Sequence, residues 1–544
     1  MTDFAPYCPV MDRTHCKILL PLFAAALLTV AACAADTAPP ATPATATATP
    51  ARVPAAADFE AAIARLEKQD PQSPQAMNAR LEYADFLMQS GIGDCRTRLD
   101  TAQTKLDIVA AQPAVRVLLP MGPARLADGT YRIHAGRADC DPSSRQSELQ
   151  RALEAARDGA RLYREALDYQ SAAVMQFNVA ATLHDLGDAG AAIAALETAI
   201  AMDREFGFRD DAADNTSLLL RWQNQDQSDD KFAGLMKDFP ARSADLKFDW
   251  SDSDADVAIQ ADDTNVAGVK VIHSRGAIVL KRHVSKDMTG TNITYDTGTP
   301  AIEAGDWTGQ NDVLRQFTAY LLGSALLGHP NFEVHRSGDF EAVRDPRAFG
   351  ASLSTQVNAL LGPARSADAE PAGPSQSLAQ DLKLVFSAPN VQAKAMQDFN
   401  VQTATWAGAK LQQGVWYQMS APLFLPGLGM GKFVIDHDIA FSFSRELPCT
   451  PGAIGPPCVE LIVHATPDAL GVKQARELVA KALKIPDPNA LRYWSTTSLR
   501  LVVKPDTLLP YVGDIRRYWY IAIDGIGNDP VISSERIVAT STYH

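Results

Sequence analysis

Residues 172–204 read AAVMQFNVAATLHDLGDAGAAIAALETAIAMDR, and this stretch decides the fold of the first half of the chain. Small or apolar side chains recur every three or four positions on both sides of a Leu-Gly-Asp break at residues 186–188. That period is typical of amphipathic helices, and a glycine beside a polar residue is typical of a turn. Ala192, Leu196 and Ala199 share one face of the second segment, where their size allows close packing. The stretch therefore predicts two helices packed against each other.

These residues resemble a tetratricopeptide repeat, a helix–turn–helix unit of about 34 residues. The stretch departs from the family at Ala180, Gln176 and Arg204, where glycine, an aromatic residue and proline are preferred. A second, degenerate copy is predicted over residues 75–113. Stacked repeats form a concave groove, so the resemblance implies a protein-binding surface with Gln176 and His184 as candidate partner contacts. An irregular helical bundle is the alternative.

Residues 114–144 interrupt the predicted repeats. They contain the runs VRVLL and TYRIHA, separated by a segment that ends in Asp128-Gly129. Because Asp-Gly is typical of tight hairpin turns, we expect a short β-hairpin here. Cys95 and Cys140 flank this insertion, and a disulfide between them would fasten it to the helical region.

The N-terminus has the pattern of an exported protein. Residues 18–30 (ILLPLFAAALLTV) form an apolar run after Arg13 and Lys17. The run is shorter than the about 20 residues that a membrane-spanning helix needs, and it suits a signal peptide. It ends in Val-Ala-Ala-Cys at Cys33, which resembles a bacterial lipobox. The resemblance implies that residues 1–32 are removed and that acyl lipid such as palmitate is attached to Cys33.

The segment after the cysteine indicates where the protein is held. Ala34 resembles the residue found in lipoproteins that are released to the outer membrane. Residues 33–56 are rich in Ala, Thr and Pro, which predicts an extended tether. We therefore expect a lipid-anchored protein on the periplasmic face of the bacterial outer membrane. A secretory signal cut elsewhere, or a short anchor, is the alternative.

Four cysteines follow the tether, and an oxidising compartment favours two disulfides among them. Three pairings are possible. Cys449 and Cys458 bracket a loop rich in proline and glycine between two strand-like runs, which favours a bond between them. Cys95 then pairs with Cys140. A zinc site is the rival interpretation, but no Cys-x-x-Cys pair supports it.

Strand-like runs dominate the chain from residue 249 onward. Several alternate apolar and polar side chains, which is typical of antiparallel strands with one buried face. The clearest runs are 277–283, 433–443, 459–465, 498–503, 518–523 and 532–542. A Pro-, Ala- and Ser-rich linker at 363–377 separates an α+β part at 249–362 from another at 378–544. The sequence is compatible both with one sheet shared by the two parts and with a separate sheet in each.

The sequence therefore predicts a multidomain chain. An α-helical, tetratricopeptide-like domain over residues 57–224 is followed by an α+β region with antiparallel sheets. The formal net charge of -14 argues against nucleic-acid binding, which needs clustered Lys and Arg.

No residue pattern points to an enzyme, a metal site or a cofactor. The glycine-rich loop at 427–432 lacks the helix and the Ser or Thr that a phosphate loop requires. Asp436 and Asp438 lie on one strand face and His437 on the other, so the three cannot meet at one metal. We predict no catalytic, cofactor-binding or metal-binding residues and expect a non-enzymatic protein.

Three functions remain in competition, and an enzyme whose type no sequence motif reveals is the third. The first is a scaffold, in which the helices bind another protein of the cell envelope. The second is a carrier, in which aromatic residues of the C-terminal region line a pocket for a hydrophobic ligand and two arginines meet its anionic headgroup. The candidate residues for that pocket are Trp416, Phe433, Phe441, Trp494, Trp519, Arg516 and Arg517. An ordinary packed core is the alternative for the aromatic residues. The mixture of curved antiparallel strands and helices is similar to periplasmic lipid-carrier folds.

Overall fold

The computed structural model describes residues 55–544 except 70–72, 91–92, 113–114, 116–118, 120, 224–228, 237–241, 252, 268–269, 288–289, 297, 305–321, 336–337, 361–385, 425–433, 451–456, 483–484 and 524–530. Residues Ala55–His544 form one compact unit. The predicted signal peptide, Cys33 and nearly all of the predicted tether lie outside the described residues. None of the described helices is both long enough and apolar enough to cross a membrane.

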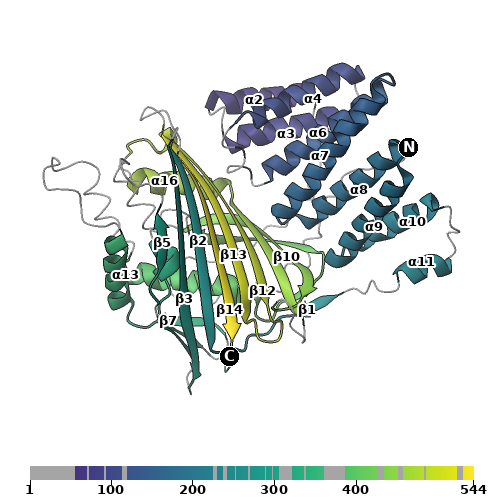
Figure 1. Cartoon of the computed structure of the whole chain (residues 1–544). Coiled ribbons are helices and arrows are strands. Elements are labelled where there is room, and N and C mark those ends of the chain that lie inside the picture. The colour runs from purple at the N-terminus through teal and green to yellow at the C-terminus, as the bar shows by residue number, and fades with distance from the viewer. Residues whose placement is uncertain are drawn as a thin grey trace, which may run out of the picture. The chain divides into compact units, whose positions relative to one another are not determined.

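The first part of this unit is helical, as predicted (Figure 1). Its helices are α2 (Ala56–Gln69), α3 (Pro74–Gln89), α4 (Cys95–Ala110), α6 (Gly122–Cys140), α7 (Arg145–Glu165), α8 (Tyr169–Asp185), α9 (Ala189–Phe206), α10 (Arg209–Trp222) and α11 (Asp229–Met236). Asp94, Asp168 and Asp188 each precede a helix and accept a hydrogen bond from its first turn. Such caps satisfy N–H groups that have no partner within the helix. Gly187, with a φ of 85°, makes the turn between α8 and α9.

The expected hairpin at residues 114–144 is wrong, because most of this segment forms helix α6. Gly129 lies inside α6, where a Cβ atom would come within 2.7 Å of Leu106 Cδ1 on α4. The missing side chain therefore lets the two helices approach closely. Asp128 pairs with Arg132 one turn along α6. Packing against α4 outweighs the local turn preference of Asp-Gly.

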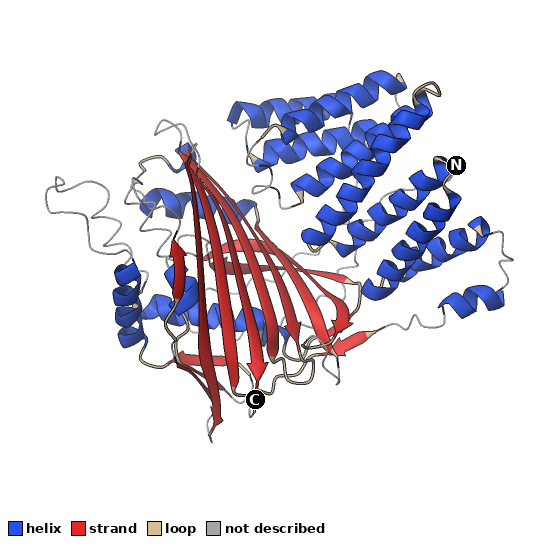
Figure 2. Ribbon diagram, in the orientation of Figure 1, coloured by secondary structure: helices blue, strands red, loops and turns tan. Residues whose placement is uncertain are grey.

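A large antiparallel sheet follows the helices and confirms the predicted fold class (Figure 2). Twelve strands belong to it, in the order β7-β6-β4-β3-β2-β14-β13-β12-β11-β10-β9, with β5 paired to β3. Strands from residues 249–362 and from 378–544 therefore share one sheet. The strands are β2 (Ala255–Ala267), β3 (Lys270–Lys286), β4 (Gly290–Asp296), β5 (Ala301–Ala304), β6 (Phe332–His335), β7 (Phe340–Val343), β9 (Trp416–Phe424), β10 (Val434–Leu447), β11 (Cys458–Pro467), β12 (Leu491–Val503), β13 (Pro510–Ile523) and β14 (Val531–Tyr543). Strands β1 (Ser243–Asp245) and β8 (Lys410–Gln412) form a separate pair.

The two faces of the sheet pack against different partners. One face, which we call the covered face, packs against α13 (Pro346–Leu360), α15 (Ala388–Gln402), α16 (Ala469–Ala482) and the β1–β8 pair. The other, which we call the helical-side face, packs partly against α2–α10 through residues such as Tyr520, Ile532 and Ile462. Side chains alternate between the two faces along each strand.

A buried ionic cluster joins the helical region to the sheet. Glu460 on β11 is fully buried and pairs with Arg500 at 2.6 Å and with Arg445 at 3.3 Å. Arg445 also lies over the ring of Phe206 at the end of α9 and pairs with Glu205. Because burying a lone carboxylate is costly, the two arginines offset the cost of burying Glu460. The cluster fixes the end of α9 on the sheet.

Candidate ligand-binding sites

Two core clusters of the covered face meet at residues that are only partly buried. Ile515 on β13 and Ile537 on β14 are cross-strand neighbours and both point to this face. Ile515 packs beside the core cluster under the β1–β8 pair, whereas Ile537 packs beside the cluster under α13. Both residues, and Ala539 next to them, belong to the intermediate class between buried and exposed. We call these three residues the central seam.

A row of polar side chains crosses the covered face directly beside the central seam. The strand register places five cross-strand neighbours in this polar row: Thr497, Arg517, Glu535, Asp263 and Ser274. Arg517 Nη1 donates to Glu535 Oε2 at 3.1 Å. The covered face is thus amphipathic, because an apolar band lies beside a charged one.

Asp263 is the most perturbed carboxyl of the polar row. Its exposed fraction is 2%, and its oxygens accept hydrogen bonds from Asn265 at 2.7 Å and from Ser533 at 3.3 Å. Burial, together with the negative charge of Glu535, raises the pKa of Asp263 to about 7. Near neutral pH the row can therefore gain or lose one proton.

Helix α15 adds a second ion pair near the polar row. Lys394 and Asp398 form this pair one turn apart, and their side chains are 41% and 33% exposed. Burial acts to raise the pKa of Asp398, but Lys394 and then Arg517 hold it below its usual value. Burial and the charge of Lys394 lower the pKa of His329 to about 4, so that imidazole is neutral at pH 7.

The structure separates the residues that the sequence grouped into one aromatic pocket. Phe441, Trp519 and Arg517 point to the covered face. Trp416, Trp494 and Arg516 point to the helical-side face, where the two tryptophans pack against helix-facing core clusters. Phe433 lies outside the described residues.

Arg516 shows why the two neighbouring arginines cannot share one ligand. Its Nη1 donates to the carbonyl oxygen of Glu165 at the end of α7, at 2.8 Å, and its Nη2 pairs with Asp514 at 3.2 Å. Arg517 bonds Glu535 on the opposite face. Adjacent residues of a strand point to opposite sides of the sheet, so the Arg-Arg pair is divided between a helix contact and the polar row.

The two candidate partner contacts on α8 have different surroundings. Gln176 Nε2 donates to the carbonyl oxygen of Ala195 on α9 at 3.3 Å and so contributes to helix packing. His184 is exposed and its ring stacks on Trp222 of α10, with 4.4 Å between the ring centroids. Of the two, His184 offers the more accessible surface.

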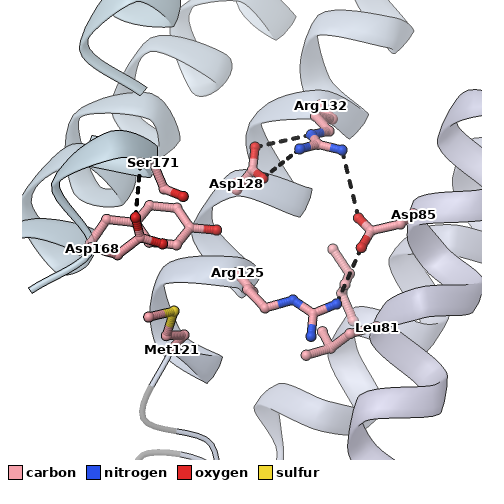
Figure 3. Close-up of a pocket in the computed structure, with 10 residues that line it drawn as sticks. Leu81, Asp85, Met121, Arg125, Asp128, Arg132, Asp168 and Ser171 are labelled. Atoms are coloured by element: carbon pink, nitrogen blue, oxygen red, sulfur yellow. Dashed lines mark hydrogen bonds and ion pairs between the residues drawn. The ribbon is translucent and has the colours of Figure 1, made fainter. Parts of the chain in front are cut away.

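A second cavity lies among the helices of the N-terminal region. Its volume is about 300 Å³, in the range of small-molecule pockets. Figure 3 shows its charged residues around an open space, with Asp168 and Ser171 across from Arg125 and Asp85. We call it the polar pocket, and its lining residues are Leu81, Asp85, Leu106, Met121, Arg125, Asp128, Arg132, Tyr163, Asp168 and Ser171.

Both arginines of the polar pocket are held by carboxylates. Arg132 makes two hydrogen bonds to Asp128, at 2.7 and 3.0 Å, and lies 3.8 Å from Asp85. Arg125 donates to Asp85 at 3.2 Å and to the side-chain oxygen of Asn78 at 2.5 Å. The result is a continuous ionic chain from α3 to α6.

The described residues assemble no catalytic group that we recognise. His464 Nδ1 lies 3.0 Å from Ser498 Oγ, but the other ring nitrogen, Nε2, is buried and makes no hydrogen bond. A serine nucleophile needs a histidine that is oriented by a third group, which is missing from this pair. Within the described part of the chain, no group of His, Cys, Asp and Glu could hold a metal ion.

Both predicted disulfides form. Cys449 is bonded to Cys458 across the loop between β10 and β11, and Cys95 at the start of α4 is bonded to Cys140 at the end of α6. The second bond joins two helices, not the flanks of a hairpin.

Comparisons with known proteins leave the family open. No protein-family model matches the chain. No curated protein matches it either. Among solved structures, a lipovitellin described under the heading of lipid–protein interactions aligns with a TM-score of 0.25 and 8% identity, over 54% of this chain. The aligned part spans only a quarter of the lipovitellin chain.

Proposed function

We propose that the protein carries an amphiphilic, lipid-like molecule on the covered face of its sheet. The observation behind this proposal is the central seam: Ile515 and Ile537 lie in the middle of two central strands, yet both remain partly exposed. Central positions of a sheet that is packed on this face are normally filled by side chains at close to crystal density. An acyl chain laid along the seam would bury this surface at about 25 cal/mol per Å².

The polar row supplies the other half of the binding surface. A headgroup beside the seam would meet Arg517 and Glu535 from the sheet, and Lys394 and Asp398 from α15. These side chains carry equal numbers of positive and negative charges, which suits a zwitterionic or hydroxyl-rich headgroup better than a strongly anionic one. The sequence-based expectation of an anionic headgroup at both Arg516 and Arg517 is therefore replaced by contact with Arg517 alone.

We further propose that acylation of Cys33 holds this carrier at the periplasmic face of the outer membrane. The two disulfides favour this location, because such bonds persist in oxidising compartments. A tether of Ala, Thr and Pro would let the folded unit reach the membrane surface and collect or deliver its ligand there.

Binding of a protein partner by the helical region is a second proposal. It rests on the resemblance of residues 172–204 to a tetratricopeptide repeat and on the exposed stack of His184 on Trp222. Replacing His184 with Ala should release a stoichiometric envelope-protein partner in affinity purification. Retention of that partner would remove this surface from consideration.

The carrier proposal is tested on the full chain with Cys33→Ser, exported to the periplasm and examined by native mass spectrometry. We expect an added mass of several hundred daltons that is lost on unfolding. Ala539→Leu, which fills the central seam, should lower the bound fraction. Val279→Leu is the matched control, because Val279 is 57% exposed on the helical-side face. A protein that carries no ligand, or equal loading of both variants, would contradict the proposal.

A further inference from the structure

Among the residues that the structure describes, the lining of the polar pocket has one carboxylate more than it has cations. It contains three carboxylates, from Asp85, Asp128 and Asp168, but only two guanidinium groups, from Arg125 and Arg132. The ionic chain described above uses both arginines to neutralise Asp85 and Asp128. The third carboxylate, Asp168, forms no ion pair with any described residue. Asp168 is partly buried, and a carboxylate withdrawn from water in this way is stabilised when a cation or several hydrogen-bond donors compensate its charge.

Among the described residues, Ser171 is the hydrogen-bond donor to the carboxylate of Asp168. One of its oxygens accepts the backbone N–H of Ser171 at 3.0 Å, as the cap of α8. Burial nevertheless raises the pKa of Asp168, and the bonds from Ser171 offset this only in part. The carboxylate therefore retains acceptor capacity that its own helix does not satisfy.

Tyr163 places a second unused polar group in the same cavity. Its side chain lines the pocket, although the residue is only 6% exposed. Its hydroxyl makes no hydrogen bond to any described residue. The backbone N–H of Asp168 donates to the carbonyl oxygen of Tyr163 at 2.9 Å, which keeps the two residues together. Burial, and then the charges of Asp128 and Asp168, raise the pKa of Tyr163, so the hydroxyl stays protonated.

We infer that the polar pocket binds a small organic cation, a primary amine on a compact apolar body. The ammonium group donates hydrogen bonds to the carboxylate of Asp168 and to the hydroxyl oxygen of Tyr163. Leu81, Leu106 and Met121 line the same cavity and contact the apolar body. Hydrogen bonds to a charged group are stronger than neutral ones, so Asp168 contributes more to affinity than Tyr163.

The test uses the full chain with Cys33→Ser and three probes of equal length: n-hexylamine, n-hexanol and n-hexanoate. Isothermal titration at neutral pH should detect the amine, with much weaker binding of the alcohol and none of the carboxylate. Asp168→Asn keeps a side chain that caps helices well but removes the charge, and should weaken amine binding at least about tenfold. Tyr163→Phe removes one oxygen and should weaken it about fivefold.

Two controls make the result specific to this pocket. Asp188→Asn changes the equivalent cap of α9, which is exposed and outside the pocket, and should leave amine affinity unchanged. Ala539→Leu fills the central seam and should also leave it unchanged, so failure of the carrier proposal does not affect this inference. Preference for hexanoate, equal binding of alcohol and amine, or unchanged amine affinity in both Asp168→Asn and Tyr163→Phe would overturn it.

Discussion

Replacing Asp263 with Asn should stabilise the protein, increasingly so as the pH rises. A carboxyl whose pKa is 3.8 in the unfolded chain and about 7 in the fold binds its proton more tightly when folded. The stabilisation that comes from this tighter proton binding is therefore fully present below pH 4. It falls as the pH rises to 7, by about 4 kcal/mol in total. Asparagine cannot ionise, so it avoids this loss. Its oxygen can still accept from Asn265, and its amide can donate to Ser533.

Urea unfolding of the full chain at pH 5 and pH 8 measures this effect. The stability advantage of Asp263→Asn over the wild type should grow by about 2.5 kcal/mol between the two conditions. Asp262→Asn is the matched control. Asp262 is the preceding residue, 40% exposed on the helical-side face and paired with Arg275, so its loss should change stability by less than about 1 kcal/mol. An Asp263→Asn variant that is less stable than wild type at pH 8 would refute the reasoning.

Two further changes test the packing of the helices and their attachment to the sheet. Gly129→Val should cost about 1–3 kcal/mol of stability, because its side chain would collide with Leu106. Gly190→Ala is the comparison, because no neighbouring atom lies within 4 Å of the added carbon, and it should be neutral or slightly stabilising. Thermal unfolding compares the two variants, and equal melting temperatures would contradict the close helix contact. Glu460→Gln should cost about 3 kcal/mol in urea unfolding, because it leaves the partly buried Arg500 without its countercharge and Arg445 with Glu205 alone. A loss below about 1 kcal/mol would show that the buried cluster does not hold the junction.

Local patterns in the sequence were sufficient for most of the elements, but not for helix α6, where they predicted a hairpin. The three-to-four residue period of 172–204 predicts two helices, and α8 and α9 occupy this stretch with a left-handed turn at Gly187. Alternation predicted the strands, and the runs at 433–443, 459–465 and 532–542 correspond to β10, β11 and β14. The disulfide between Cys449 and Cys458 also followed from local pattern, because both ends of a short loop must lie close together.

Tertiary contacts determined the features that depend on which element packs against a residue. The local pattern of Asp128-Gly129 predicts a turn. In the fold the pair lies in α6, where the glycine allows close contact with α4. Arg516 and Arg517 look like one basic site, but the sheet separates them because neighbouring strand residues face opposite ways.

The proposed binding surfaces could not have been found in the sequence. The polar row joins Arg517, Glu535 and Asp263 from three strands, two of which lie more than 250 residues apart in the chain. The polar pocket needs Asp168 and Tyr163 beside α3, α4 and α6. Local periodicity and spacing predicted most helices and strands and the bond between Cys449 and Cys458, because these features depend on residues close together in the chain. Which polar groups are neutralised and which are not emerged from the fold alone, because charge compensation and burial depend on neighbours that are distant in sequence.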